Sequence, residues 1–282
     1  MTRVARLRSL PIIGSMVAMS DLLPRQVHLE GAHNFRDLGG YRLSCGGVFS
    51  AARVYRSDHL GGLTDDDRKK LVSLGVTTVV DFRRAFERAE NPDRLEGTGI
   101  DEVWLPVEAD GVDVINIRRA VEAGEVDAAG ARDYLIRANT AFVTHFSRVF
   151  SDFLHLLLEP DRLPLVFHCS AGKDRAGFAA ALTLLIAGAS RQAIMQDYLA
   201  TNHCNARYRQ SLKASLVTRG ATDETRRALD ALMQVHPTYL GAAFAAIESG
   251  YRDDDHYFSS ALELDGSKRA NLKRLLTHRG QD

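Results

Sequence analysis

The sequence predicts an α/β fold in which helices flank a central, mostly parallel sheet, and the order of its strand and helix candidates supports this. Thr64 precedes three aspartates and an amphipathic segment that ends at Gly75, so a capped helix is expected there. Strand candidates lie on both sides of this helix, at residues 52–56, 76–81 and 103–107. A strand, a helix and another strand in this order are typical of parallel pairing.

The second half of the chain continues the pattern. Residues 165–168 are a short buried strand candidate, and residues 178–189 are a buried helix candidate that is interrupted at Gly188. Residues 112–158, and most of the chain after residue 200, carry apolar side chains at three- and four-residue steps, which predicts helices. Ser267 is expected to cap the last of them.

The composition restricts the class of protein and of partner. The chain has 282 residues, of which 45% are apolar, enough for a large core. Lys plus Arg and Asp plus Glu number 36 each, so no overall field attracts nucleic acid or an anionic membrane, and any anion site must be local. Cys45, Cys169 and Cys204 are too few and too scattered for a disulfide framework or a zinc site, which predicts a reducing compartment.

The first residues imitate a weak secretion signal. Residues 3–8 are basic and residues 10–19 mildly apolar, but a proline, a glycine and a serine interrupt this short stretch. We expect a disordered leader over residues 1–26, or a true start at Met16 or Met19. The longest strongly apolar run is far shorter than the ~18 residues that span a membrane. A cytoplasmic protein, or one exported without a clear signal peptide, fits these features.

One loop carries the chemistry. In the segment His168–Gly177, Cys169 ends a predicted strand and Arg175 stands where a helix begins. Backbone N–H groups of such a loop converge with the positive end of the helix, and Gly172 and Gly177 let the main chain turn tightly and approach an anion. The loop therefore predicts a phosphate cradle. The same field favours the thiolate form of Cys169.

Each residue of this cysteine loop, residues 169–175, has an expected role. Cys169 attacks phosphorus and forms a phosphocysteine. Arg175 is a planar clamp for two phosphate oxygens, also in the transition state. The residues expected to form the cradle are His168, Ser170, Ala171, Gly172 and Lys173. A nucleotide-binding loop is excluded, because Phe167 and Asp174 occupy positions that such a loop reserves for Gly and for Ser or Thr.

Two of these residues need a separate comment. His168 is expected to fix the loop, not to act as a base, because a thiolate needs none. Lys173 is a lysine in a chain that otherwise prefers arginine, so it is either a second phosphate ligand or a chance occurrence.

With these motifs, the chain resembles the bacterial tyrosine and lipid phosphatases of the tyrosine phosphatase B and LipA kind, in the cysteine-dependent protein tyrosine phosphatase superfamily. The matching motifs are Cys-x-x-Gly-Lys-Asp-Arg at 169–175, Asn34-Phe-Arg-Asp37, Tyr55-Arg-Ser57, Asp81-Phe-Arg83 with Glu87, and Asp197-Tyr-Leu-x-x-Asn202.

The resemblance implies a protein tyrosine phosphatase-like fold in a single domain, residues 27–282, without metal or cofactor. It also implies activity on phosphotyrosine, extending in some members to phosphoserine, phosphothreonine or phosphoinositides. A helical lid should cover the site, and residues 112–158 are where it should lie. Lys173 is similar to the loop lysine of phosphoinositide phosphatases, so the expected partner is a phosphorylated protein or a phosphoinositide.

The sequence leaves the general acid, the effect of position 176, the choice of function and the oligomeric state open. The general acid must be a carboxylic acid at the mouth of the loop, and Asp174 and Asp81 are both candidates. Position 176 is alanine where related loops carry Ser or Thr, which predicts slow breakdown of the phosphoenzyme. A catalytically weak module that binds phosphoproteins is therefore the alternative function, and sulfur or arsenate chemistry at Cys169 is a third. The oligomeric state has no signal in the sequence.

Overall fold

The computed structural model describes residues 25–44, 46–108 and 117–279. At its centre is a six-stranded sheet. Four neighbouring strands of this sheet, the last four in the spatial order given next, pair in parallel, as predicted. In spatial order the strands are β1 (Arg25–Gln26), β2 (Arg36–Asp37), β4 (Val54–Ser57), β7 (Leu165–His168), β5 (Thr78–Asp81) and β6 (Asp101–Trp104). β1 pairs antiparallel with β2, and β2 pairs antiparallel with β4. A separate two-stranded sheet joins β3 (Gly47–Phe49) to β8 (Thr277–Arg279).

The strands alternate between two apolar layers. In β7, Leu165 and Phe167 belong to the larger core cluster, whereas Val166, between them, belongs to the smaller one. Successive side chains of a strand point to opposite faces, so this short buried strand needs no polar position at all. The consequence is a sheet that is covered on both sides.

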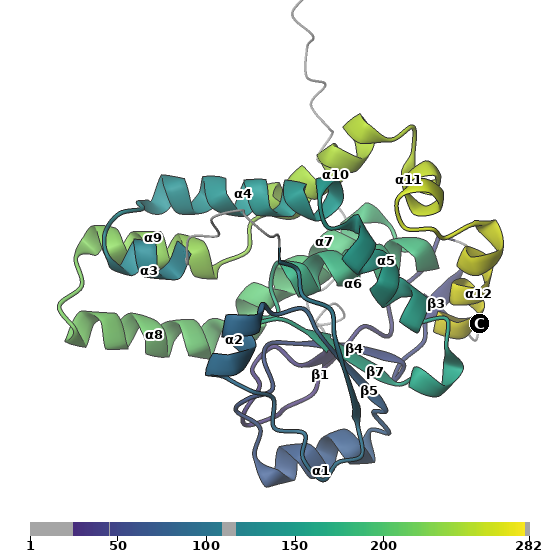
Figure 1. Ribbon diagram of the computed structural model, residues 1–282, viewed down its shortest axis with the longest axis horizontal. Coiled ribbons are helices and arrows are strands. Elements are labelled where there is room, and N and C mark those ends of the chain that lie inside the picture. The colour runs from purple at the N-terminus through teal and green to yellow at the C-terminus, as the bar shows by residue number, and fades with distance from the viewer. Residues whose placement is uncertain (1–24, 45, 109–116, 280–282) are drawn as a thin grey trace, which may run out of the picture.

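Helices supply these two layers (Figure 1). α1 (Asp65–Ser73) packs Leu71 into the smaller cluster, below the sheet in the view of Figure 1. Its start is the predicted one, since Thr64 Oγ1 accepts from the Asp67 amide at 3.2 Å. The larger cluster lies under helices that come mostly from the second half of the chain: α5 (Ser147–Leu156), α6 (Arg175–Ala187), α7 (Arg191–Cys204), α11 (Asp254–Ser260) and α12 (Gly266–Leu276).

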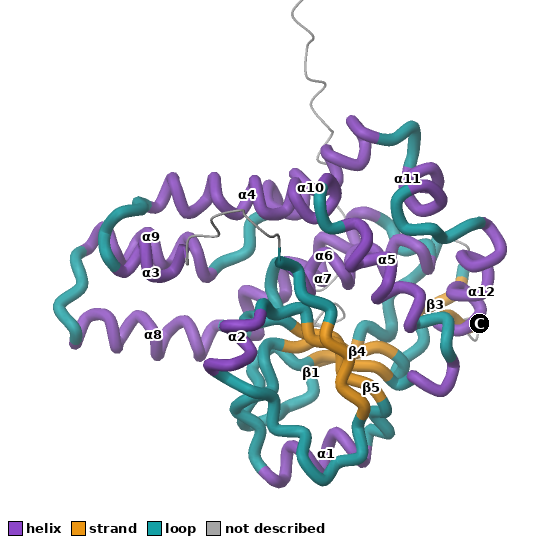
Figure 2. The backbone as a smooth tube through the Cα atoms, viewed as in Figure 1, coloured by secondary structure: helices purple, strands orange, loops and turns teal. Residues whose placement is uncertain are grey.

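Beyond the sheet, further helices form an elongated arm, seen on the left of Figure 1 and in the purple tube of Figure 2. Its members are α3 (Ile117–Glu122), α4 (Ala128–Thr144), α8 (Ala206–Thr218) and α9 (Asp223–Met233), with α10 (Pro237–Gly250) lying along α4. The helices expected within residues 112–158 and after residue 200 are thus confirmed for the described residues. α2 (Ala85–Glu90) is a short helix between β5 and β6.

The span expected for a lid differs from what the structure contains. α5 is not a cover, because Phe153 stacks edge-on against Phe82 and Phe167 in the core. Aromatic rings are large apolar groups, so packing them against the sheet stabilises the fold, whereas a cover over an open site would leave them exposed to water. α8 and α9, which lie outside the expected span, accompany α3 and α4 instead. Residues 112–116 of the span lie outside the described residues.

Two terminal details also differ from expectation. Arg25 and Gln26, placed in the leader, pair with β2, while residues 1–24 lie outside the described part. The cap of α12 is Asp265, whose carboxylate accepts from the Lys268 amide at 2.8 Å; Ser267 donates to the same carboxylate. A carboxylate one residue before the helix is better placed to accept from the N3 amide than a hydroxyl already inside it.

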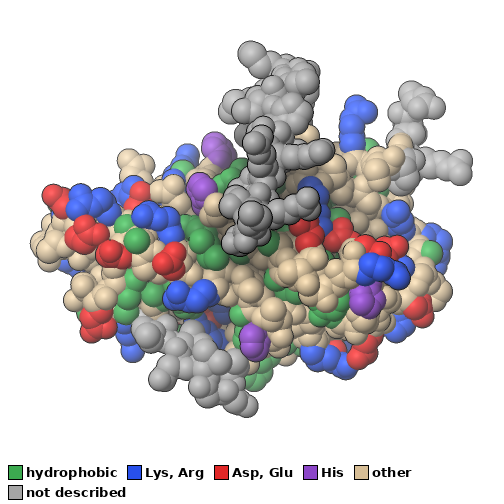
Figure 3. All heavy atoms as spheres, turned by 90° about the horizontal axis from the view of Figure 1, so that it is seen from above, with side chains coloured by type: hydrophobic (Ala, Val, Ile, Leu, Met, Phe, Trp, Pro, Cys, Tyr) green, Lys and Arg blue, Asp and Glu red, His purple; other side chains and the backbone are tan. Residues whose placement is uncertain are grey.

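Charge is spread over the surface. Acidic and basic side chains intermingle on the face seen in Figure 3, in line with the balanced totals of the sequence. Within the described ranges, no helix combines the length and the apolar character that crossing a membrane would require.

Candidate active site

The cysteine loop lies at the carboxyl edge of the parallel strands. Ser57, His168 and Asp81 are register partners that end β4, β7 and β5, and Cys169 directly follows the middle one. This edge is where open α/β sheets bind ligands. The loop then leads into α6, so Cys169 and Arg175 stand at its two ends as predicted.

Side chains from other elements donate hydrogen bonds to the carbonyl groups of the loop. Asn34 Nδ2 donates to the carbonyls of Ala171 and Gly172 at 3.1 and 2.9 Å. Asn205 donates to Ala171 at 3.0 Å, and Arg56 Nη2 to Gly172 at 2.6 Å. In a trans peptide the next N–H points opposite to the carbonyl, so these bonds turn the loop amides toward the other side. Among the described residues, none of the amides 170–174 donates a hydrogen bond to protein. The loop can therefore offer several donors to one anion.

Gly172 makes this geometry possible. Its φ is +63°, and a Cβ there would lie 2.4 Å from the Ser57 carbonyl oxygen. Only glycine combines a left-handed backbone with so close an approach to the neighbouring strand. The functional glycine expected from the sequence is thus also a packing requirement.

A buried charge cluster forms the floor of the loop. Asp197, on α7, accepts from Arg36 Nε at 3.1 Å and from Arg56 Nη1. All three side chains are at most 2% exposed. Burial opposes ionisation of Asp197, yet the two guanidinium groups hold its pKa below the usual value. Two cations and one anion leave one positive charge beneath the loop, which favours an anion above it. The sequence motifs that contain these residues are explained by this floor.

Glu87 orients Arg175, a function that the sequence analysis did not assign. Arg175 Nη1 and Nη2 donate to the two Glu87 oxygens at 2.7 and 2.8 Å. Ser170 Oγ also donates to Glu87. Burial raises the pKa of Glu87, but the bonds from Arg175 and Ser170 outweigh it and hold this pKa well below the usual value. Nη1 also donates to the Phe82 carbonyl oxygen at 3.2 Å, so only the Nε–H of Arg175 has no partner within the described chain. In this conformation Arg175 offers a ligand one donor, not the two that the sequence predicts. The available signal was the spacing Asp81-x-Arg83-x-x-x-Glu87.

The two candidate acids have different surroundings. Asp81 is fully buried, and Arg83 holds both of its oxygens through Nε and Nη2 at 2.8 to 3.1 Å. Asp174 has a side chain that is 20% exposed, and its Oδ2 lies 3.2 Å from Lys173 Nζ. Asp81 is therefore held inside the strand edge, whereas the Asp174 side chain, directly before α6, stays partly exposed.

His168 belongs to the same buried network as Asp81. Its Nε2 lies 3.0 Å from Asp93 Oδ2, and its Nδ1 lies 3.3 Å from the Cys169 carbonyl oxygen. Burial opposes the imidazolium, but Asp93 and Asp81 raise the pKa of His168, while His168 and Arg83 hold the pKa of the buried Asp93 at about 2. The position of His168 agrees with a role in fixing the loop.

Asp81, Asp93 and His168 also form the one group in the described chain whose ligand atoms are close enough for a metal ion. Arg83 Nη2 lies 2.8 Å from an oxygen of each of the two aspartates. A guanidinium between the carboxylates supplies the positive charge that a cation would bring. These residues thus fit an ion-pair network and not a metal centre.

Lys173 departs from the sequence prediction. Its side chain is 5% exposed and turns away from the loop interior, where its ammonium donates to the carbonyl oxygens of Leu232 and Gln234 at the end of α9. Carbonyls at a helix C-terminus attract a cation. In this conformation Lys173 joins the loop to the arm and is not a phosphate ligand. Ala176 is fully buried in the first turn of α6, so no hydroxyl faces Cys169 from this position.

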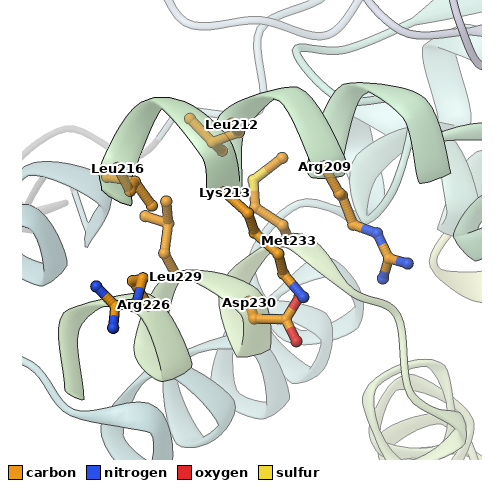
Figure 4. A pocket seen from close by; sticks show the side chains of 8 residues that line it. All are labelled: Arg209, Leu212, Lys213, Leu216, Arg226, Leu229, Asp230 and Met233. Atoms are coloured by element: carbon orange, nitrogen blue, oxygen red, sulfur yellow. The ribbon is translucent and has the colours of Figure 1, made fainter. Parts of the chain in front are cut away.

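A cleft between α8 and α9 is separate from this site (Figure 4). Lys213 and Asp230 face one another across it, 2.7 Å apart, beside apolar side chains of both helices. It encloses about 10 Å³, the size of a single water position. This cleft is too small for a substrate.

The chain is similar to known phosphatases. The model of the tyrosine phosphatase family matches residues 27–278. A Cupriavidus necator protein provisionally named a tyrosine-protein phosphatase is 30% identical over 253 residues, 86% of this chain and 89% of that protein. The triple specificity protein phosphatase PtpB of Mycobacterium tuberculosis is 30% identical over 274 residues, 88% of this chain and 96% of that protein. Among solved structures, P. aeruginosa TpbA with phosphotyrosine covers 72% of this chain and 91% of its own at 20% identity, but its TM-score of 0.29 is too low to support a conclusion.

Proposed function

Since the chain belongs to the tyrosine phosphatase family, we propose that it hydrolyses phosphotyrosine through a covalent phosphocysteine on Cys169. The observation that carries this proposal is the cysteine loop itself. Side chains outside the loop bind its carbonyl groups, its amides 170–174 donate to none of the described residues, and a buried positive charge lies beneath it. These features favour a thiolate before the reaction and a phosphoryl group during it.

In the first step, the Cys169 thiolate attacks phosphorus and the bond to the tyrosine oxygen breaks. Asp174 gives its proton to this leaving oxygen, and the partial exposure of its side chain, 20%, supports this assignment over the fully buried Asp81. Arg175, held by Glu87, and the loop amides carry the charge of the phosphoryl oxygens.

In the second step, water attacks phosphorus on the phosphocysteine. The Asp174 carboxylate takes a proton from this water, the sulfur–phosphorus bond breaks, and Cys169 leaves as a thiolate. Inorganic phosphate and the starting enzyme result. The same aspartate thus serves as acid and then as base, which returns it to its first protonation state.

The range of substrates is a finer part of the proposal. One relative is named a triple specificity phosphatase, which supports testing phosphoserine and phosphothreonine peptides beside phosphotyrosine. Phosphoinositide hydrolysis would require Lys173 to leave the α9 carbonyls and turn toward the loop. We therefore expect phosphotyrosine to be the preferred substrate.

The direct test is the hydrolysis of para-nitrophenyl phosphate and phosphotyrosine peptide in EDTA, by wild type and Cys169→Ser. We expect metal-independent turnover that the substitution abolishes, and a phosphoenzyme that acid quenching traps from wild type alone. Turnover that survives in Cys169→Ser would refute the mechanism.

Ala176 supports a second candidate function, a module that holds phosphorylated partners in the same loop with little turnover. Without a hydroxyl beside Cys169, the thiolate is a poorer leaving group in the second step. This candidate predicts tight binding of phosphopeptide and a phosphoenzyme that persists. Ala176→Thr should then speed phosphoenzyme breakdown, whereas Ala179→Thr, at a buried alanine one turn further along α6, should not.

A further inference from the structure

The Asp174 carboxylate does not make the helix-capping hydrogen bond that its position before α6 would allow. Asp174 is the N-cap residue of α6, yet its side chain caps no amide of that helix. Oδ2 faces Lys173, and Oδ1 is buried with no hydrogen-bond partner among the described residues. A buried carboxylate oxygen without a donor destabilises the folded protein. A hydrogen-bond donor is therefore expected next to Asp174 Oδ1.

Tyr198 is the residue that can supply it. Its ring packs against the first turn of α6 so closely that a Cβ on Gly177, three residues after Asp174, would lie 2.8 Å from two ring carbons. Tyr198 is fully buried, and its hydroxyl is also without a hydrogen-bond partner in the described chain. An unpaired buried donor and an unpaired buried acceptor thus stand on neighbouring side chains.

The electrostatics agree with this proximity. Burial raises the pKa of Tyr198 well above its usual value, and the Asp174 carboxylate raises it further. The hydroxyl therefore keeps its proton at neutral pH. It can donate to Asp174 but cannot replace it as the acid.

We propose that Tyr198 is a positioning residue for the general acid: its hydroxyl donates to Asp174 Oδ1 and fixes the carboxyl group at the mouth of the cysteine loop. Lys173 holds the other oxygen, 3.2 Å away, and is itself held by the α9 carbonyls. With both oxygens held, the carboxyl group keeps one orientation, and it gives its proton in the first step and takes one back in the second from that fixed position. This inference rests on the proposed function, because it needs Asp174 as the acid.

Asp197 and Tyr198, adjacent residues of α7, then contact two different parts of the site. Asp197 holds the arginine floor beneath the loop, and Tyr198 holds the acid beside it. Gly177 is required for the second contact, since any side chain there would push the tyrosine ring away.

The test compares substrates whose leaving groups differ in their need for a proton. Phenyl phosphate has a poor leaving group, and para-nitrophenyl phosphate a good one. Because general acid catalysis contributes roughly 10²–10⁴-fold, we expect Tyr198→Phe to lower kcat/KM about tenfold for phenyl phosphate and less than about threefold for para-nitrophenyl phosphate. Asp174→Asn should show the same selectivity more strongly. In the Asp174→Asn background, adding Tyr198→Phe should change the ratio no further.

Controls separate this role from a structural one. Phenylalanine keeps the ring that packs on Gly177, and thermal unfolding reports whether the variant folds as wild type does. Tyr257→Phe removes another buried hydroxyl, bonded to Ser147 at 3.0 Å, and should leave the substrate ratio unchanged. An equal loss for both substrates in Tyr198→Phe, or no loss for either, would overturn the inference.

Failure of the proposed function gives a different result. If wild type lacks turnover, or if Cys169→Ser retains it, the phosphatase proposal and this inference both fall. If wild type is active but Asp174→Asn is insensitive to the leaving group, the phosphatase stands while the acid and its positioning residue are both wrong.

Discussion

At the scale of single residues, the site depends on groups that touch no substrate. Glu87 illustrates this, because its one negative charge is shared by Arg175 and, through Arg84 Nε at 3.3 Å, by a second guanidinium. A long arginine side chain has many rotamers, and a bidentate partner removes most of them before a ligand arrives. Glu87 therefore prepares Arg175 without contacting the phosphoryl group.

Replacing this partner gives the first prediction. Glu87→Gln leaves Arg175 with a neutral neighbour, so the guanidinium loses its fixed orientation. We expect kcat/KM to fall by about 100-fold, the scale of losing one well-placed donor to the transition state. We also expect the free energy of unfolding to fall by about 3 kcal/mol, because a buried charge loses its partner. Activity assays and urea unfolding measure the two effects.

The matched control for this prediction is Glu263→Gln. Glu263 makes an ion pair of similar length with Arg148, 2.8 Å, but both side chains are more than half exposed. An exposed pair contributes at most about 1 kcal/mol, so this variant should resemble wild type in both assays. Equal behaviour of the two variants would show that Glu87 does not orient Arg175.

At the scale of elements, the cysteine loop is fastened to the strand edge on one side and to the arm on the other. On the strand side, His168 and Arg83 join the ends of β7 and β5 to Asp93, in the segment that leads from α2 to β6. On the arm side, Lys173 holds the end of α9. Both connections are charged and buried, so each makes a distinct prediction.

The strand-side connection predicts a dependence of stability on pH. The pKa of His168 is raised in the folded protein, so its contribution to stability is fully present below the unfolded value of about 6.5. This contribution is lost as the pH rises through the higher folded value. Urea unfolding across neutral and mildly alkaline pH should show the loss in wild type and not in His168→Asn.

On the acid side, the dependence of stability on pH has the opposite sign, because stability is lost as the pH falls. Asp93 has a folded pKa of about 2, below its usual 3.8, so its contribution is present above the unfolded value and is lost as the pH falls through the folded one. His278→Asn, at a residue of β8 remote from this network, is the control for the histidine variant. A His168→Asn profile parallel to wild type above neutral pH would contradict the buried ion pair.

The arm-side connection predicts coupled motion. Lys173→Met keeps the apolar stem but removes the ammonium that binds the α9 carbonyls. Hydrogen exchange measured by mass spectrometry should therefore become faster at the end of α9 and in the link to α10. Lys213→Met, which removes the more exposed pair with Asp230, is the matched control. Unchanged exchange in Lys173→Met, with loss of turnover on phosphoinositides alone, would instead make Lys173 a phosphate ligand.

At the scale of the whole molecule, a sheet buried on both faces supports a long helical arm that begins beside the site (Figure 1). The total charge is balanced, so the attraction of an anion comes from a few buried groups beneath and around the loop. Such groups are screened by salt much less than surface charges are. The fold thus concentrates a positive field in one place while the surface stays mixed in sign.

The sequence determined the parallel strands of the sheet, the first helix, the loop and its two end residues, because these depend on local patterns. It did not predict β1, β2 or the pair of β3 and β8. Runs of β-branched and apolar residues, a capping threonine and the spacing from Cys169 to Arg175 are all visible along the chain. The sequence also identified Asp174 and Asp81 as candidates for the general acid. It could not choose between them, because the groups that surround each carboxylate are not visible along the chain.

Only the tertiary structure decided which groups surround the loop. Glu87 and Asn34 reach it from elements far away in sequence, Tyr198 packs on Gly177 just after it, and no local pattern encodes these contacts. The direction of Lys173 depends on the carbonyls of α9, and the burial of α5 depends on aromatic rings of the sheet. Local periodicity predicts that a helix forms, but the choice between core and cover is made by the partners that pack against it, because burial is a property of the assembled chain.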